Sequence, residues 1–210
     1  MIIAWGSCAV FGGPAGAGNI HTSAEIVDSV YLNNKTTTPH QPPSREVSAL
    51  EASVTPIDQV IDVDLYLAGC PPHPAYIFDA LLSLLEGRTP KATKESVCAK
   101  CKRQMKKADV TEIRQHTDGI PDPDLCFLSQ GYICMGSATI DRCLAPCPTN
   151  GVPCTGCAGA TMQILSEPNR DIRTEIAERM SRLTKIQYDE IVKEIEKVPN
   201  LIIHTQWPPG

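Results

Sequence analysis

The sequence predicts an α/β domain, followed by a cysteine-rich segment with little regular secondary structure and then by a helical tail. Two apolar segments within the first 90 residues, each leading to a glycine and a cysteine, predict strands of a parallel sheet. Eight of the ten cysteines lie between Cys98 and Cys157. A charged amphipathic pattern from Asn169 to about Val198 predicts a helix or a helix pair. We therefore divide the chain into residues 1–90, 91–162 and 163–210.

The first domain begins with an apolar strand from Met1 to Trp5, which leads into a glycine-rich turn that contains Cys8. We expect Trp5 to pack in the core, because aromatic side chains at strand ends commonly do. A helix is predicted from Ser23 to Leu32, with Ser23 as its capping residue. Its apolar face comprises Ile26, Val27, Val30 and Tyr31. A loop rich in proline and threonine follows, from Thr36 to about Pro56.

The second strand is predicted in "VIDVDLYLAGC", residues 60–70, where apolar residues alternate with polar ones. Its apolar face comprises Ile61, Val63, Leu65 and Leu67. A helix is predicted from Ala75 to Leu85, with Pro74 at its start and "EGRTP" at its end. Both Cys8 and Cys70 therefore follow the carboxyl ends of strands, where open α/β sheets place their functional sites.

Composition excludes two classes of partner. The 210 residues carry a net charge of −5 and no basic stripe, so nucleic acid is not an expected partner. No apolar run approaches the roughly 20 residues that span a bilayer, so membrane insertion is not expected.

The tail is predicted to be a packing helix. Its apolar positions are Ile172, Ile176, Met180 and Leu183, and the pattern continues with Ile191, Ile195 and Val198.

The cysteines predict metal ligation rather than disulfide bonding. Eight of them crowd into the segment from 98 to 157, in a chain too long to need disulfide stapling, which favours metal ligands in a reducing compartment. The spacings are Cys98-x2-Cys101, Cys126-x7-Cys134, Cys143-x3-Cys147 and Cys154-x2-Cys157. Eight thiolates make two four-thiolate sites. Iron-sulfur cubanes accept such uneven spacings better than zinc knuckles do, although structural zinc stays open as an alternative.

Four motifs resemble a known family. They are "GSCAVFGG", "AGCPPHP", "CFLSQGYICMGSATIDRC" and "PCTGC". Together they are similar to the small, electron-transferring subunit of nickel-iron hydrogenases, of the cytoplasmic, methyl-viologen-reducing type that works with heterodisulfide reductase. The resemblance covers about residues 1 to 162 and rests mainly on the cysteine framework.

The resemblance implies a flavodoxin-like domain that holds a proximal cluster, followed by an irregular domain that holds a medial and a distal cluster. It assigns Cys8 and Cys70 to the proximal cluster. It assigns to the distal cluster Cys98, Cys101, Cys126 and Cys134. It assigns to the medial cluster Cys143, Cys147, Cys154 and Cys157.

Two positions depart from the periplasmic members of the resembled family, which have histidine in place of Cys98 and proline in place of Cys147. Where proline leaves one corner without a ligand, the medial cluster is a 3Fe-4S species, so Cys147 implies a 4Fe-4S cluster. A thiolate in place of imidazole makes the distal cluster more negative and lowers its potential. Both departures favour a low-potential electron path, as would suit a cytoplasmic acceptor.

A CxGC motif is missing. In the resembled family, the proximal cluster takes its first two ligands from this motif, well before the strand that begins this chain. The two predicted strands are too few for a stable sheet. We expect the sequence to be a truncated form whose missing part supplies the other strands and cysteines; a split gene and a degenerate copy are the alternatives. The chain then holds two complete 4Fe-4S clusters, and a third only with that segment.

The implied function is electron transfer within a nickel-iron hydrogenase, with no catalytic acid, base or nucleophile on this chain. Hydrogen is split on a separate large subunit. Electrons then pass through the clusters to an iron-sulfur adaptor subunit and the heterodisulfide reductase complex in the cytoplasm. Two alternatives are a structural zinc-binding subunit and the related iron-sulfur subunit of respiratory complex I, which shares the "GSC" and "GCPP" portion but carries a single cluster.

Basic residues surround the cysteines assigned to the distal cluster: Lys100, Lys102, Arg103, Lys106 and Lys107. They are either a solvated face or a surface that steers an acidic redox partner. His73, in the "CPPHP" loop, is expected to be an ordinary surface histidine.

Overall fold

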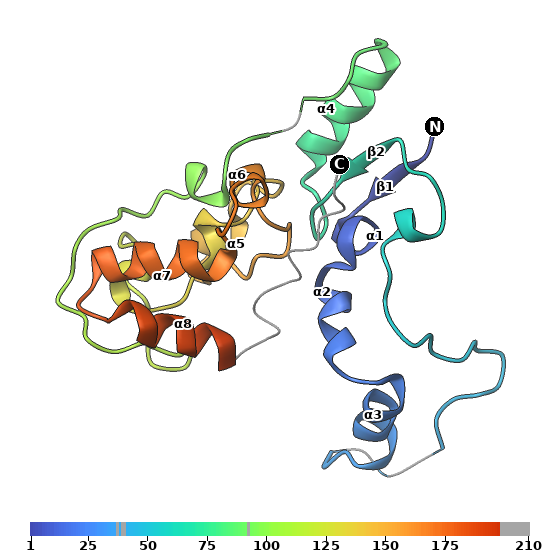
Figure 1. The fold of residues 1–210 in the computed structure, drawn as a ribbon, viewed down its shortest axis with the longest axis horizontal. Helices are drawn as coiled ribbons and strands as arrows, with labels where there is room; N and C mark the ends of the chain where they lie inside the picture. Colours follow the sequence, from blue (N-terminus) through green and yellow to red (C-terminus); the bar gives the residue numbers. More distant parts are fainter. Residues whose placement is uncertain (37, 39–40, 92, 198–210) are drawn as a thin grey trace.

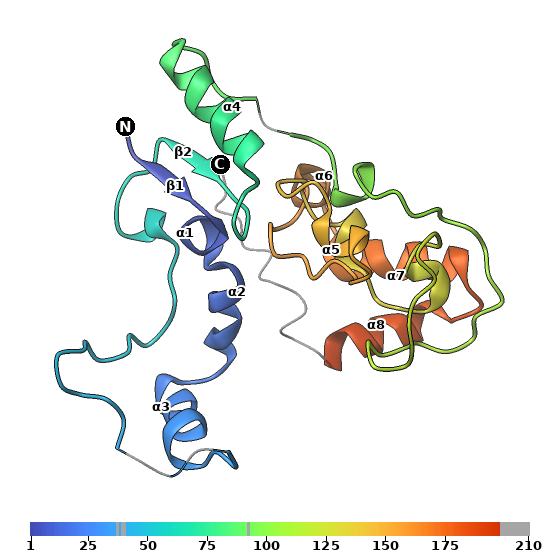
Figure 2. The ribbon, with the colours of Figure 1, turned by 180° about the vertical axis from the view of Figure 1, so that it is seen from behind.

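The computed structural model describes residues 1–36, 38, 41–91 and 93–197. The chain forms two lobes (Figures 1 and 2). The first contains a small sheet with helices α1 to α4, and the second contains α5 to α8 with the loops that connect them. The part of the predicted tail from 198 to 210, which includes Val198, lies outside the described residues.

The sheet of the first lobe has two parallel strands, β1 (Ile3–Trp5) and β2 (Leu65–Leu67). Their register pairs Ile3 with Leu65 and Trp5 with Leu67. The predicted α/β class with parallel strands is confirmed, but both strands are shorter than predicted. The pairing of the two strands begins at Ile3 and Leu65, although the Ile2 carbonyl already accepts from the Asp64 amide at 2.9 Å and the Ile2 amide donates to the Asp64 side chain at 2.6 Å. Residues 60–64 form an irregular bend instead of the start of β2.

Short helices follow β1. They are α1 (Ser7–Phe11), α2 (Gly13–Gly16), the 3-10 helix η1 (Ala17–Ile20), α3 (Ser23–Val27) and the π-helical turn η2 (Asp28–Leu32). The predicted helix from Ser23 to Leu32 is therefore confirmed as α3 and η2. The prediction that Ser23 caps it is wrong. Thr22 caps α3, because its hydroxyl accepts from the Glu25 amide while the Glu25 carboxylate accepts from the Thr22 amide.

The helix after β2 is α4 (Pro74–Leu85), as predicted, with Pro74 in its first turn. A 3-10 turn, η3 (Ile57–Gln59), precedes β2. The prediction that Trp5 packs in the core is wrong, since 45% of Trp5 is exposed. Among the described residues, the sheet has two strands only, so the ring at the end of β1 has too little neighbouring structure to be covered.

The segment from 91 to 162 contains short elements only. They are the 3-10 helices η4 (Val97–Ala99), η5 (Leu128–Gln130) and η6 (Met135–Ser137), the single-turn helix α5 (Pro146–Thr149) and the start of α6 (Met162–Ser166). The helix α7 (Ile172–Leu183) packs against η5 and η6, and α8 (Tyr188–Lys197) packs against α7. The buried side chains of Ile176, Met180 and Ile191 join Phe127 and Tyr132 in one core. The predicted tail helices thus complete the core of the cysteine-bearing segment.

No helix in the described part of the chain is long and apolar enough to cross a membrane.

Candidate metal centres

All ten cysteines are free thiols. They fall into three groups, which we call the 98–134 set (Cys98, Cys101, Cys126 and Cys134), the 143–157 set (Cys143, Cys147, Cys154 and Cys157) and the Cys8/Cys70 pair. Among the described residues, no three His, Cys, Asp or Glu side chains form a site for a single metal ion. An iron-sulfur cluster is larger than one ion, so its ligands are further apart and its fit must be judged from other observations.

The 98–134 set is brought together by three short elements. Cys98 lies in η4 with Cys101 beside it, Cys126 precedes η5, and Cys134 precedes η6. Burial, together with the neighbouring thiols of Cys126 and Cys101, raises the pKa of Cys98 to about 12. Burial also raises the pKa of Cys134 to about 12, and the thiols of Cys98 and Cys126 add to this shift. The four predicted ligands therefore lie close enough to act on one another.

Gly136 shapes the space between these thiols. A Cβ atom at this position would lie 3.3 Å from Cys98 Sγ and 3.6 Å from Cys134 Sγ, so the missing side chain leaves room beside both sulfurs. Backbone amides also point at the sulfurs: those of Gly136 and Cys154 donate to Cys134, and the Cys154 bond is 3.3 Å long. Such N–H donors stabilise a cluster thiolate, so this set fits a four-thiolate cluster.

The 143–157 set comes from two loops and α5. Cys147 lies in α5, whose first turn follows Leu144 and Ala145, both left-handed with φ of 60° and 56°. Burial raises the pKa of Cys157 to about 12, with further contributions from Cys154, Cys143 and Cys147. The structure thus places all four predicted ligands of this set within electrostatic reach of Cys157.

Asp141 positions Cys143 and is a residue that the sequence analysis did not single out. Its carboxylate is fully buried and accepts hydrogen bonds from the amides of Cys143 (3.3 Å) and Leu144 (3.0 Å). The hydroxyl of Tyr76 in α4 also donates to it. An aspartate two residues before a cysteine is a common turn pattern, so only the fold shows that this one is buried and reaches α4.

The Cys8/Cys70 pair lies where the sequence predicts it, just beyond the carboxyl ends of β1 and β2. Both side chains are exposed. Burial raises the pKa of the Cys70 thiol, and the Cys8 thiol raises it further. Within the described residues, the pair contributes two thiols, half of what a four-thiolate cluster needs.

The three groups follow one another through the molecule. Cys70 contributes to the raised pKa of Cys157, which places the pair next to the 143–157 set. The Cys154 amide donates to Cys134 Sγ, which joins the 143–157 set to the 98–134 set. The 143–157 set therefore adjoins each of the other two groups.

Comparisons with known proteins identify relatives of this chain. The family described as NADH ubiquinone oxidoreductase, 20 Kd subunit matches residues 1–84. The chain is 42% identical over 161 residues to a subunit of the vhu F420-non-reducing hydrogenase of Methanocaldococcus jannaschii, covering 77% of the chain and 56% of that relative. It is 33% identical over 224 residues to the iron-sulfur subunit of the F420-non-reducing hydrogenase of Archaeoglobus profundus, covering 96% of the chain and 67% of that relative.

The chain belongs to the family of F420-non-reducing hydrogenase iron-sulfur subunits. The resemblance to hydrogenase electron-transfer subunits is thereby confirmed. The chain spans a little over half the length of several curated hydrogenase subunits that it matches, such as 55% of the one from Methanothermobacter thermautotrophicus. It is also similar to a chain in a crystal structure of an NAD+-reducing NiFe-hydrogenase, with a TM-score of 0.41, 33% identity and coverage of 44% of this chain and 54% of the other.

The basic residues near the 98–134 set have different environments in this hydrogenase iron-sulfur subunit. The Arg103 guanidinium lies 4.0 Å from the centre of the Phe127 ring and donates to the carbonyls of Pro148 (2.9 Å) and Leu125 (3.0 Å). Arg103 therefore holds loops together. Lys100 pairs with Glu95 at 2.7 Å. The exposed side chains that remain for a partner are those of Lys102, Lys106 and Lys107.

His73 has a structural role. Its Nδ1 accepts a hydrogen bond from the Ala75 amide at 3.2 Å and so caps α4. Its own amide donates to the carbonyl of Arg142 at 2.7 Å, which joins the loop after Cys70 to the loop before Cys143. The histidine is partly buried, so it is more than the ordinary surface residue predicted from the sequence.

The metal-free chain should lose stability at alkaline pH. Burial raises the pKa values of Cys134, Cys154 and Cys157 to about 12, whereas an unfolded thiol ionises near about pH 8.5. Above that pH the unfolded chain releases protons that the folded chain keeps, so the free energy of unfolding falls as pH rises. Urea unfolding under reducing conditions should show a lower midpoint at about pH 10 than at about pH 7.

Cys134→Ala removes one of these buried thiols, so the midpoint should fall less steeply with pH in this variant. A midpoint that rises between the two pH values would contradict the protonated, buried state of these thiols.

Proposed function

We propose that the chain is an electron-transfer subunit of a nickel-iron hydrogenase. It relays electrons from hydrogen oxidation in a separate large subunit, through 4Fe-4S clusters, to a cytoplasmic acceptor. The observation that carries this proposal is the row formed by the Cys8/Cys70 pair, the 143–157 set and the 98–134 set. The relatives support it, because they are named as subunits of F420-non-reducing hydrogenases.

Each four-thiol set would hold one 4Fe-4S cluster, which when bound carries single electrons. The 98–134 set would form the distal site and the 143–157 set the medial site. The chain's own contribution is to supply thiolates, aim backbone amides at them and bury them. The backbone amides of Leu128 and Ser129 donate hydrogen bonds to the Cys126 sulfur, and those of Gly136 and Cys154 donate to the Cys134 sulfur. Amide donors of this kind raise the potential of a cluster, whereas four thiolates lower it.

The Cys8/Cys70 pair would belong to the proximal site, nearest to the large subunit. A four-thiolate cluster there needs two thiolates besides those of the pair. We assign β1, β2 and α4 to a flavodoxin-like domain that carries this site. The proposed acceptors are an iron-sulfur adaptor subunit and a heterodisulfide reductase complex, as the resemblance implies. The exposed Lys102, Lys106 and Lys107 lie near the distal set and suit an acidic partner there.

The deciding experiment compares redox-active clusters with structural zinc. After anaerobic reconstitution with iron and sulfide, the chain should show a broad visible absorbance that bleaches when dithionite is added. A chain purified from cells that remains colourless, binds zinc in place of iron and does not respond to dithionite would contradict the proposal. Two separate signals in a redox titration would also distinguish this chain from the complex I subunit, which carries a single cluster.

A further inference from the structure

One side chain, Ser7, connects the loops of three predicted ligands. It is buried, with 1% of its surface exposed. Its hydroxyl donates to the carbonyl of Cys157 at 2.6 Å and accepts from the amide of Gly69 at 3.0 Å. Ser7 directly precedes Cys8, and Gly69 directly precedes Cys70. A single hydroxyl thus links both members of the Cys8/Cys70 pair to a ligand of the 143–157 set.

These bonds are not those of an ordinary helix start. A serine at the capping position before a helix commonly accepts a hydrogen bond from an amide in the first turn. Gly6 holds the capping position of α1, and the hydroxyl of Ser7, the first helical residue, bonds residues 62 and 150 positions away in the sequence. The Ser7 amide also donates to the Gly69 carbonyl at 2.8 Å. The polar groups of Ser7 are therefore directed at the two other ligand loops.

An apolar contact shields this bridge. Phe11, at the end of α1, is 6% exposed and lies against Gly159, where a Cβ atom would be only 2.9 Å from the ring. Cys157 packs against the same small core, which also contains Ala4, Val10 and Ala68. Because water is kept away from the Ser7 hydroxyl, solvent does not replace a hydrogen bond that is removed here.

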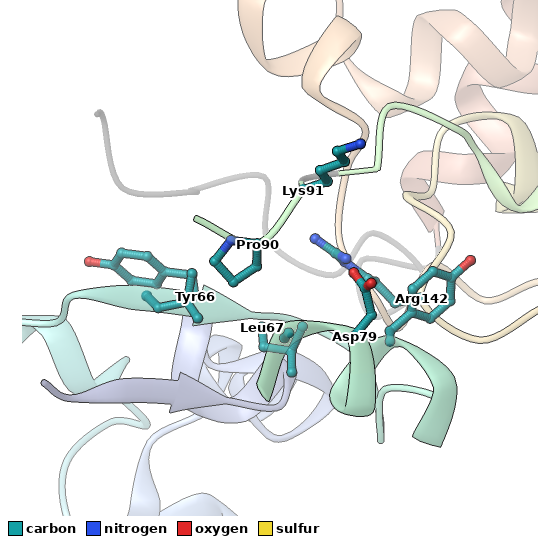
Figure 3. A pocket seen from close by; sticks show the side chains of 9 residues that line it. Tyr66, Leu67, Asp79, Pro90, Lys91 and Arg142 are labelled. Atoms are coloured by element: carbon teal, nitrogen blue, oxygen red, sulfur yellow. The ribbon is translucent and has the colours of Figure 1, made fainter. Parts of the chain in front are cut away.

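A second link joins the two lobes on the side of α4. The His73 amide donates to the Arg142 carbonyl, and the Tyr76 hydroxyl donates to Asp141. The Arg142 guanidinium lies 5.7 Å from the centre of the Tyr76 ring and lines a small cavity of about 70 Å³ together with Asp79 (Figure 3). Removing the Ser7 hydroxyl should therefore loosen the lobes without separating them.

We propose that Ser7 is a positioning residue of the electron path, whose hydroxyl holds the Cys8/Cys70 pair at a fixed place against Cys157 and supplies the hydrogen-bonded connection between the two sites. The inference rests on the proposed function, because an electron path exists here only if both groups hold clusters. The hydrogen-bond bridge itself does not depend on bound metal.

The test uses Ser7→Ala, with Ser7→Thr as the variant that keeps a hydroxyl. The control is Ser83→Ala in α4, which removes a buried hydroxyl whose hydrogen bond, accepted from Arg88 at 3.4 Å, stays at the end of that helix. In the full chain, the Gly69 amide should exchange with solvent about tenfold faster in Ser7→Ala, since it loses its acceptor. In the hydrogenase complex isolated with each variant, reduction of the medial and distal clusters after mixing with hydrogen should slow several-fold in Ser7→Ala, at unchanged iron content.

The control should match the parent in both measurements, and Ser7→Thr should restore slow exchange and fast reduction. Rapid exchange of the Gly69 amide in the parent chain would overturn the bridge directly, even if Ser7→Ala does not accumulate. Unchanged exchange and reduction in Ser7→Ala would overturn the positioning role. If the parent complex holds no iron, the proposed function fails, and Gly69 exchange still decides whether Ser7 joins the loops.

Discussion

Anaerobic reconstitution of the chain is expected to load about eight irons, because each set of four thiolates holds a cluster of about four irons. Cys134→Ser should lower the load to about four irons, since Cys134 is 7% exposed and a serine oxygen is a poor replacement for the buried thiolate. Cys157→Ser should have the same effect on the 143–157 set. The measurement is the amount of iron and acid-labile sulfide per chain. A redox titration then shows which of the two clusters each variant has lost.

Cys8→Ser and Cys70→Ser are the matched controls. They replace exposed thiols of the incomplete pair and should leave the iron content as in the parent chain. A parent load of about twelve irons that falls to about eight in either control would show that the pair obtains two further ligands from outside the chain, for example from a second copy. A load that is insensitive to Cys134→Ser and Cys157→Ser would contradict both sets.

The sequence predicts which cysteines lie together as close pairs, because ligand spacing is a local property. Cys98 and Cys101 must lie close together in any fold, and so must Cys154 and Cys157. How the pairs combine into sets follows from the resemblance rather than from the spacing. In the structure Cys126 and Cys134 lie near Cys98, and Cys143 and Cys147 lie near Cys157, while Cys154 adjoins both sets; the division into two sets stays a prediction.

Predictions from the local sequence are wrong where contacts with distant parts of the chain, or with neighbouring side chains, determine burial, capping or strand length. Trp5 has the sequence environment of a core residue, but its burial depends on how many strands flank β1. The cap of α3 is displaced by one residue to Thr22, because the reciprocal bonds with Glu25 favour that position over Ser23. β2 begins only at Leu65, and the Ile2 amide donates to the side chain of Asp64. None of these three outcomes follows from periodicity.

The positioning residues are the least predictable part of the site. Ser7 and Asp141 act on ligands through contacts with segments far away in the sequence. Ser7 lies 150 residues before Cys157, and Asp141 lies 65 residues after Tyr76. Their residue types are common in turns and at helix starts, so a single sequence gives no signal that separates them from other serines and aspartates.

Gly136→Ala is expected to abolish the cluster of the 98–134 set. The added methyl group would lie 3.3 Å from Cys98 Sγ and 3.6 Å from Cys134 Sγ, in the space beside both sulfurs. An alanine meets no backbone strain there, because Gly136 does not have a positive φ. The iron content should fall from about eight to about four per chain, and the lost redox signal should be the one that Cys134→Ser removes.

Gly18→Ala provides the matched control. Its added methyl group would meet only Ile26 Cδ1, at an ordinary contact distance of 3.7 Å, and Gly18 also lacks a positive φ. The control should therefore load as much iron as the parent chain. Full loading of Gly136→Ala would mean that the space beside Cys98 and Cys134 is not where the metal binds, and the four thiols of this set would then have to be assigned to another role.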